Sequence, residues 1–348
     1  MSSEPLAYFA ELCDAAGKAA QAVGGYSDRF LKVADRIIQL RFAGSALVPQ
    51  TIPALAHLET ESSLMPDLIV HICDTASTGV SMPAPPWRTA EQTFRGEAPG
   101  GYNEGHLHTS SHEWAGVLSM LDSEAGSAVF WAADAGFLHF SMRGAPLRDI
   151  LHWWLVDHGS LLVHGAGVGD SSAGVLLTGR GSSGKSTTAL ACLGAGLLYA
   201  GDDHVAVGIE PTPWLYSLYN TAHLDIGGSF TFSDLVFGIQ DPEPSNDFKL
   251  EMFIHEHRPD AIARGFPLVA IVLPRVAHRS DSRLRVASGA EMLIALAPAT
   301  ILSLPGADQA NLRQMTRLAR QVPSYVLEVG TDLSQIPPII IDLLAEHR

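Results

Sequence analysis

One segment constrains this chain more than any other, because residues 174–192 join a short apolar run to a glycine-rich turn and then to a run of helix-forming residues. The apolar run, residues 175–178, predicts a short buried strand. The turn matches the spacing G-x-x-x-x-G-K-[ST] at Gly179, Gly184, Lys185 and Ser186. A strand, a glycine loop and a helix in this order predict a binding site for the phosphates of a nucleotide.

The residue types of this loop suit phosphate binding for physical reasons. Glycines let backbone N–H groups approach a phosphate closely, and the helix that starts near Lys185 adds its N-terminal dipole. Lys185 supplies a mobile positive charge for the outer phosphates, and the Ser186 hydroxyl is placed to bind Mg²⁺. The residues expected to contact the nucleotide are Gly179, Arg180, Gly181, Ser182, Ser183, Gly184, Lys185, Ser186 and Thr187. A chance glycine turn is the alternative, and the strand and helix on either side argue against it.

A pair of adjacent carboxylates, Asp202 and Asp203, follows the predicted helix and an apolar return strand. Neighbouring residues of a strand point to opposite faces, so the two side chains are expected to have different roles. One would face a metal ion and the other the phosphate acceptor. A polar turn that ends a strand is the alternative, and the position beside a phosphate loop favours a functional pair.

These segments resemble the catalytic domain of HPr kinase/phosphorylase. That family has a His-Gly strand, a strand–loop–helix and an Ala-Asp-Asp strand in this order. The corresponding pieces here are His164-Gly165, the loop at Gly184-Lys185-Ser186, and Asp202-Asp203. The segment Leu-Asp-Ile-Gly-Gly at residues 224–228 is similar to the Leu-Glu-Ile-Arg-Gly segment of the family. The resemblance covers roughly residues 155–230, and its specific parts are the loop and the Asp pair.

The resemblance implies an α/β fold of the P-loop, HPr-kinase-like (phosphoenolpyruvate-carboxykinase-like) type, with a mixed sheet and flanking helices. It also implies a kinase that uses ATP and Mg²⁺ and transfers the γ-phosphoryl group to a serine-like hydroxyl of a peptide, a protein or a small molecule. The chain departs from the family at Gly201, where Ala is usual, and it lacks both the Arg of the Leu-Glu-Ile-Arg-Gly segment and the later loop used for phosphorolysis. It therefore looks more like divergent kinases, such as the lasso-peptide serine kinases, than like a regulator of the sugar phosphotransferase system.

The residues and the resemblance together predict a division of roles. Asp202 is expected to orient and deprotonate the acceptor hydroxyl, while Lys185 bridges to the γ-phosphate. Mg²⁺ is expected between Ser186 and one carboxylate, either Asp203 or Asp225, the second of which stands where the family has a glutamate.

Other polar residues are weaker candidates. His164 lies beside an apolar strand that should neighbour the loop, and it is either a satisfied core histidine or a contact to the acceptor or an aspartate. Residues 237–248 form an acidic, proline-containing segment that is expected to close over a substrate. Lys249 and Arg275 flank this region, either as phosphate contacts or as ordinary surface charges.

Length and charge limit the remaining possibilities. The 348 residues allow two domains, which we expect at residues 1–145 and 146–348. The net charge of −15 argues against a nucleic acid or an anionic membrane surface as a partner. Cys13, Cys73 and Cys192 have no metal-binding spacing and are odd in number. With neither a membrane-length apolar run nor a signal sequence, we expect a cytoplasmic protein, and whether it forms a homo-oligomer is left open.

Hydrophobic periodicity and turn residues predict an α+β front region of unknown role, followed by alternating strands and helices. The predicted front elements are a helix over residues 4–25, strands over 35–42 and 68–72, and a hairpin of 128–131 with 137–140. The predicted rear elements are a strand over 268–273 and one over 324–329, with helices over 147–154, 290–304, 308–321 and 335–346. A solvated loop is expected around His106, His108, His112 and Glu113, with a metal site as the less favoured alternative.

Two rivals to a kinase remain. A P-loop ATPase switch or assembly protein would use the front region to bind a partner, but such proteins usually carry one acidic residue at the end of a strand and a trans-acting arginine. A degraded kinase fold that only binds a ligand is the other rival. The paired aspartates argue against the first, and the intact Lys185 and Ser186 argue against the second.

Overall fold

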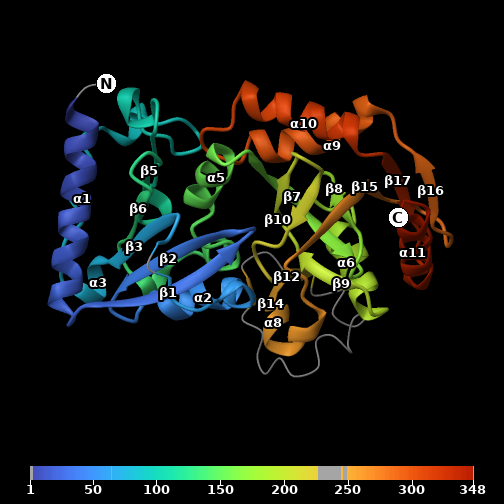
Figure 1. Ribbon diagram of the computed structural model, residues 1–348, viewed down its shortest axis with the longest axis horizontal. Helices are drawn as coiled ribbons and strands as arrows, with labels where there is room; N and C mark the ends of the chain where they lie inside the picture. The colour runs from blue at the N-terminus through green and yellow to red at the C-terminus, as the bar shows by residue number, and fades with distance from the viewer. Residues whose placement is uncertain (1–2, 64, 226–243, 246–248, 348) are drawn as a thin grey trace. The chain divides into compact units, whose positions relative to one another are not determined.

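The computed structural model describes residues 3–63, 65–225, 244–245 and 249–347 (Figure 1). The chain is a mixed α/β protein, as predicted, and it divides into two compact units that are described separately below. Unit 1 comprises residues 1–158 with 303–306, and unit 2 comprises residues 159–302 with 307–348. The division falls later than the predicted join at residues 145–146, because helix α5 (Arg148–Asp157) packs against strands of unit 1.

Unit 1 is built on a six-stranded mixed sheet with the strand order β1-β2-β3-β6-β5-β4. Its strands are β1 (Tyr26–Val33), β2 (Arg36–Ala43), β3 (Leu68–Asp74), β4 (Leu107–His112), β5 (Val117–Asp122) and β6 (Ser127–Ala132). The central strands β2, β3 and β6 run parallel to one another, and the pairs at either edge are antiparallel.

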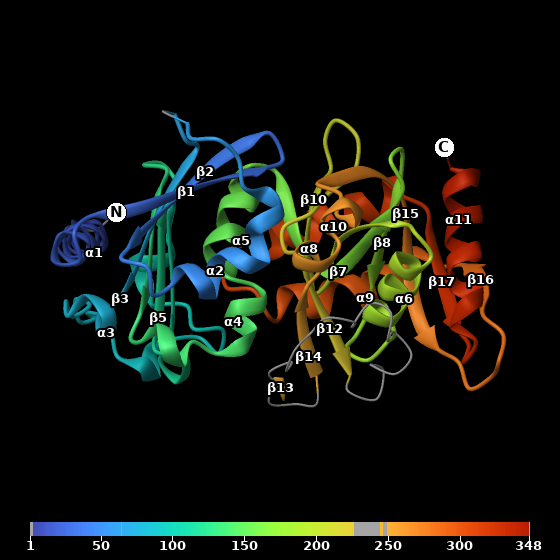
Figure 2. The same cartoon turned by 90° about the horizontal axis from the view of Figure 1, so that it is seen from below.

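Helices cover both faces of this sheet (Figure 2). The long helix α1 (Ser3–Ala22) packs on one face, where Leu12 and Ala16 are fully buried against Met120 and Trp131. The prediction of this helix is confirmed, and Gly24 and Gly25 end it in left-handed conformations. The other helices of the unit are α2 (Val48–Leu55), α3 (Thr75–Thr78), α4 (Phe140–Gly144) and α5.

Two predictions in unit 1 are wrong. Residues 137–140 do not form the second strand of a hairpin, because the Asp134 carboxylate accepts a hydrogen bond from Gly136 N at 2.8 Å and starts a 3₁₀ turn there. β6 pairs instead with the preceding strand, β5. The histidine-containing segment is also not a loop, since it forms the edge strand β4.

Unit 2 contains an eight-stranded mixed sheet with the order β11-β10-β7-β8-β15-β17-β16, in which β9 also pairs with β7 and β11 with β15. Its strands are β7 (Ser160–Gly169), β8 (Gly174–Thr178), β9 (Leu198–Gly201), β10 (His204–Gly208), β11 (Trp214–Tyr216), β15 (Gly265–Val276), β16 (Arg283–Val286) and β17 (Ser324–Val329). β8, β15 and β17 are parallel, so their carboxyl ends lie along one edge. A smaller sheet contains β12 (Thr221–Asp225), β13 (Pro244–Ser245) and β14 (Lys249–Phe253).

The central strand β8 is buried on both faces, which accounts for its uninterrupted apolar sequence. Val175 and Leu177 pack on the side of helices α6 and α11, while Leu176 packs on the side of helices α9 and α10. The helices of unit 2 are α6 (Lys185–Gly194), α8 (Ile254–His257), α9 (Gly289–Ile301), α10 (Gln309–Gln321) and α11 (Ile336–Glu346). The strands and helices predicted for this half are thus present.

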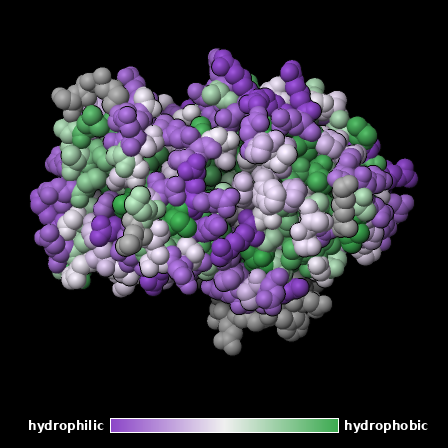
Figure 3. Space-filling view, viewed as in Figure 1, coloured by the Kyte–Doolittle hydropathy of each residue, from purple (hydrophilic) through white to green (hydrophobic). Residues whose placement is uncertain are grey.

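The surface is mainly hydrophilic on the face shown in Figure 3, with hydrophobic residues scattered over it. Among the residues that the structure describes, no helix is both long and apolar enough to cross a membrane.

Candidate active site

The loop between β8 and α6 turns through left-handed backbone conformations. Gly179, Ser182 and Gly184 have φ angles of 153°, 58° and 102°. A Cβ atom at Gly179 would lie 2.9 Å from Ser183 Oγ, so the turn needs glycine at this position. Helix α6 begins directly after Gly184, and its first turn directs backbone N–H groups and the positive end of the helix dipole toward the loop.

Lys185 folds back into this loop. Its Nζ atom donates hydrogen bonds to Gly179 O at 3.1 Å and to Arg180 O at 3.2 Å, and the residue is only 6% exposed. A buried ammonium group is stable only when it is hydrogen-bonded, and these two carbonyl groups provide hydrogen-bond acceptors for it. The positive charge is therefore held inside the loop, close to where the sequence places the phosphates.

Backbone pairing brings the acidic pair to the edge of the sheet where the loop begins. Gly165 of β7 pairs with Thr178, the last residue of β8. The Gly165 N–H also donates a 3.0 Å hydrogen bond to Asp203 O, and Thr178 Oγ1 donates to His164 O at 3.2 Å. The loop and the acidic pair therefore lie at the same edge, one strand apart.

Asp202 and Asp203 do not belong to one continuous strand, so the expected alternation between two strand faces does not apply to them. They form the tight connection between β9 and β10, and Asp203 has a left-handed φ of 64°. Their surroundings nevertheless differ strongly. Asp202 is 1% exposed, whereas the Asp203 side chain is 40% exposed.

The Asp202 carboxylate is buried beside the first turn of α6. Its Oδ1 atom accepts a hydrogen bond from Asp203 N at 2.9 Å. Its Oδ2 atom is buried and has no hydrogen-bond partner in the described part of the chain. Burial and the charge of Asp203 raise the pKa of Asp202, although a hydrogen bond from Ser186 and the charge of His223 partly oppose the shift. The result is a carboxylate with an available lone pair and an increased affinity for a proton.

Asp203 pairs with a histidine that sequence reasoning missed. His223 Nδ1 lies 3.1 Å from Asp203 Oδ2, and its Nε2 lies 3.7 Å from Glu251 Oε2. Burial lowers the pKa of His223, but the two carboxylates outweigh this effect and raise it to about 10. Burial raises the pKa of Asp203, but the hydrogen bond and charge of His223 outweigh that effect and hold it below its usual range. Asp203 thus stays ionised beside a protonated imidazole.

The strand pairing of the small sheet brings these partners together. His223 of β12 lies directly opposite Glu251 of β14. The sequence did hold one signal for His223. That residue stands two residues before the candidate Asp225 in one strand, and residues at i and i+2 of a strand lie on the same face. The side chain of Asp225 lies outside the described residues, as do that of Lys249 and most of residues 237–248, so their predicted roles remain predictions.

His164 also lies near Asp203, together with a second histidine that sequence reasoning missed. His164 and His204 are directly opposite in the pairing of β7 with β10, and their ring centroids lie 5.6 Å apart in an edge-on arrangement. Both imidazoles help to lower the pKa of Asp203. His164 is therefore part of the electrostatic surroundings of the acidic pair.

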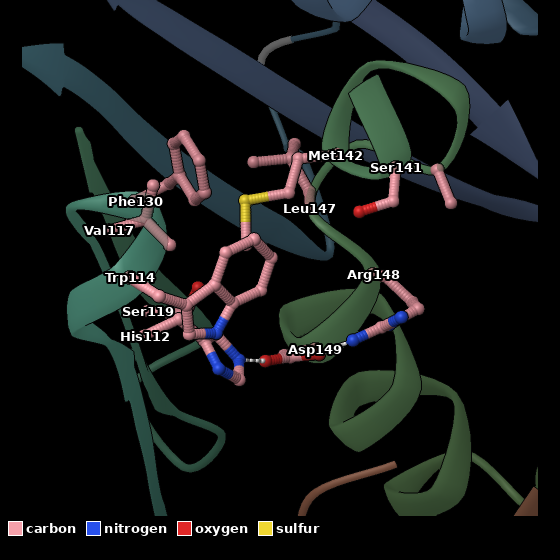
Figure 4. A pocket seen from close by; sticks show the side chains of 11 residues that line it. His112, Trp114, Val117, Ser119, Phe130, Ser141, Met142, Leu147, Arg148 and Asp149 are labelled. Carbon is pink, nitrogen blue, oxygen red and sulfur yellow. Dashed lines mark hydrogen bonds and ion pairs between the residues drawn. The ribbon is translucent and has the colours of Figure 1, made fainter. Parts of the chain in front are cut away.

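A second group of charged side chains lies in unit 1, beside a hollow of about 80 Å³ (Figure 4). Asp149 accepts hydrogen bonds there from His112 Nε2 at 3.0 Å and from Ser110 Oγ at 2.7 Å, and Arg148 contacts its other oxygen at 3.3 Å. Figure 4 shows these charged groups at one end of the hollow and apolar side chains, including Phe130 and Met142, at the other. The charges thus satisfy one another within the unit.

His106, just before β4, and His108 and His112 within it each lie against a different carboxylate. His106 contacts Asp122 and His108 contacts Asp157, while His112 contacts Asp149. Over all described residues, no group of three or more His, Cys, Asp or Glu side chains is placed to hold a metal ion. Each histidine instead has its own carboxylate.

Comparison with known proteins gives a distant structural likeness. No family model and no curated protein matches this chain. The structure of the Hpr(Ser) kinase/phosphatase from Coxiella burnetii matches it with 14% sequence identity and a TM-score of 0.29, over 54% of this chain and 95% of that chain. At this level of likeness, any function has to follow from the residues of this chain themselves.

Proposed function

We propose that this protein is an ATP-dependent kinase that transfers the γ-phosphoryl group to a serine-like hydroxyl of a peptide, a protein or a small molecule. One observation carries the proposal. The loop at residues 179–186 and the acidic pair of Asp202 and Asp203 lie at one edge of the sheet, and Ser186, at the start of α6, is close enough to Asp202 to lower its pKa. Phosphoryl transfer requires mainly positioning and charge neutralisation, and this arrangement supplies both.

The loop holds the donor. Backbone N–H groups of residues 180–186 and the dipole of α6 bind the phosphates. The Lys185 ammonium leaves the carbonyl oxygens of Gly179 and Arg180 and moves onto the outer phosphates, since phosphate oxygens are charged acceptors and bind it more strongly than neutral carbonyls do.

The residues beside the loop fit Mg²⁺. This ion prefers oxygen ligands, and the Ser186 hydroxyl and the ionised Asp203 carboxylate provide them. The ion pair with His223 orients Asp203, and such outer partners are common for carboxylates that bind metals. A bound Mg²⁺ would neutralise part of the charge of the phosphates. Lys185 and the dipole of α6 supply further positive charge beside the phosphates. Because Mg²⁺ usually keeps several water ligands and also binds the phosphates of the substrate, one or two protein side chains are enough to hold it.

Asp202 acts as the general base in this scheme. A base works best when its pKa is raised toward the working pH, and burial with the charge of Asp203 raises that of Asp202. Its buried Oδ2 atom, which has no hydrogen-bond partner in the described part of the chain, is the atom to which we assign the proton of the acceptor hydroxyl.

The test is phosphate transfer from γ-labelled ATP by the purified full-length chain with Mg²⁺, with and without serine-containing peptides. We expect acceptor-dependent ADP formation with label on the acceptor, and its loss in both Lys185→Ala and Asp202→Asn. Asp14→Asn, an exposed carboxylate of α1, is the matched control and is expected to behave like the wild type. ATP hydrolysis that needs no acceptor and survives Asp202→Asn would instead indicate an ATPase switch.

A further inference from the structure

A cavity of about 290 Å³ lies against the other flank of the phosphate loop. Three segments of unit 2 line it: the start of the loop, the carboxyl end of β15 and the N-terminal half of α9. The lining residues are Gly179, Arg180, Ser183, Leu273, Pro274, Arg275, Glu291, Ile294 and Ala295. Its volume lies near the lower end of the range for small-molecule sites, roughly 300 Å³.

The order of the strands places this cavity and the acidic pair on opposite sides of the loop. β7, which carries the contact to Asp203, is one neighbour of β8, and β15 is the other. Val272 of β15 pairs with Leu177 of β8 in parallel register, so the residues after Val272 run alongside the beginning of the loop. A ligand whose phosphates lie in the loop and whose terminal phosphate faces Asp202 has its opposite end at this cavity.

The walls of the cavity suit a flat, partly apolar group. Ile294 is 60% exposed, although it is a large hydrophobic residue next to a polar loop, and Ala295 adjoins it on α9. Pro274 and Arg275, both from β15, also line the cavity, and guanidinium groups stack on aromatic rings. An ion pair of 3.4 Å with Glu291 anchors Arg275.

One of the lining residues, Ser183, also carries a buried polar atom without a partner among the described residues, which points to a ligand. Ser183 Oγ is buried and has no hydrogen-bond partner in the described part of the chain. Buried polar atoms without a partner are rare in folded proteins, and a bound ligand can supply the missing hydrogen bond. Once the Ser183 side chain rotates toward the cavity, a ribose hydroxyl or the first phosphate would supply this bond.

We infer that this cavity binds the nucleoside moiety of the phosphate donor, with the base between Ile294 and Ala295 on one side and Pro274 and Arg275 on the other. The inference rests on the proposed function, because it takes the phosphates to lie in the loop. It assigns a role to Arg275 that differs from both sequence-based alternatives, a phosphate contact and an ordinary surface charge.

The inference is tested with two probes, ATP and inorganic tripolyphosphate, whose binding to the full-length protein is measured by calorimetry in the presence of Mg²⁺. Ala295→Phe fills the cavity and is expected to weaken ATP binding about tenfold or more, with tripolyphosphate binding unchanged. Ile294→Ala is a milder variant at an exposed site and is expected to weaken ATP binding about threefold to tenfold. Ala290→Phe, on the same helix but outside the cavity, is the control and should change neither.

The outcomes separate this inference from the function on which it rests. If the wild-type protein binds neither probe, the proposed function fails. If instead the wild-type protein binds ATP and both cavity variants bind ATP equally well, the nucleoside lies elsewhere. The same holds if both variants lose ATP and tripolyphosphate to the same extent, and in either case only the cavity assignment is overturned. Photolabelling with 8-azido-ATP gives an independent readout, because the label should be found in residues 273–275 or 291–295.

Discussion

The imidazole of His223 bridges the Asp203 and Glu251 carboxylates, with Nδ1 3.1 Å from Asp203 Oδ2 and Nε2 3.7 Å from Glu251 Oε2. Burial of the histidine and the attraction of the carboxylates act on its pKa in opposite directions, and the attraction prevails. A cation is therefore held beside the acidic pair at neutral pH. This arrangement determines which of the two aspartates stays charged.

The first prediction concerns stability as a function of pH. The pKa of His223 rises from 6.5 to about 10 on folding, so its contribution is fully present below pH 6.5 and is lost as pH rises toward 10. We expect His223→Gln to lower the free energy of unfolding by about 1.5 kcal/mol at pH 6, the lower end for hydrogen bonds to charged groups, because the Asp203 side chain is 40% exposed. Urea unfolding followed by circular dichroism measures this.

The pH series supplies the decisive comparison for His223. The difference between the wild type and the variant should shrink steadily from pH 6.5 to pH 10, while Asp203 remains ionised throughout that range. The exposed His257→Gln is the matched control and should show no such trend. A difference that stays constant with pH would show that His223 is neutral in the folded protein.

The second prediction separates the two aspartates. We expect Asp202→Asn to lower kcat by about 10²- to 10⁴-fold, the typical contribution of a general base, with the Mg²⁺ concentration for half-maximal rate unchanged. Asp203→Asn should raise that Mg²⁺ concentration instead. Initial rates over a Mg²⁺ series measure both effects. If high Mg²⁺ restores the rate of Asp202→Asn, the two roles are reversed, and Asp202 rather than Asp203 shares the metal site with Ser186.

The third prediction concerns Lys185. Because its ammonium is buried and bonded to loop carbonyl groups, Lys185→Met loses those hydrogen bonds but also relieves the burial of a charge. We expect a change of about 1 kcal/mol or less in the free energy of unfolding, together with loss of binding to both ATP and tripolyphosphate. Thermal unfolding and calorimetry test the pair of effects. A variant that unfolds readily would mean that the ammonium mainly supports the loop.

The fourth prediction concerns Asp149 in unit 1. The Arg148 charge and the bonds from His112 and Ser110 outweigh burial and hold the pKa of Asp149 below its usual range, so its contribution to stability is present above pH 3.8 and is lost as pH falls. Asp149→Ala removes one partner of a buried charged network and is expected to destabilise the protein by about 3 kcal/mol or more. Denaturant unfolding at pH 7 measures this effect.

The control for Asp149 is the exposed Asp14→Asn, which should stay within about 0.5 kcal/mol of the wild type. The difference between the wild type and Asp149→Ala should also disappear as pH falls well below 3.8. An unchanged stability of Asp149→Ala at pH 7 would contradict the network.

Several features could be predicted because their causes are local in the sequence. The loop at Gly179–Ser186 is defined by glycine spacing over a few residues, and the strand before it and the helix after it follow from nearby hydrophobic patterns. The same holds for α1, which has a helical repeat and two glycines at its end. At residues 137–140 the local pattern was ambiguous, and a single hydrogen bond from Gly136 N to the Asp134 carboxylate decided the conformation.

The partners of the acidic pair have a different origin. Glu251 reaches His223 only because β12 pairs with β14, and His204 reaches His164 only because β10 pairs with β7. Residues far apart in the chain make these contacts, so no short pattern announces them. The pKa of each aspartate depends on those neighbours and on burial, neither of which a sequence motif specifies.

The amino-acid sequence by itself determined that this protein has a strand–loop–helix suited to phosphates, with two aspartates one strand further on. The tertiary structure alone decided that Asp202 is buried with a raised pKa, that Asp203 is paired with a protonated His223, and that a cavity lies between the loop and α9. The physical reason is that backbone propensities act over a few residues, whereas burial, charge pairing and cavity shape depend on which distant segments the sheet brings together.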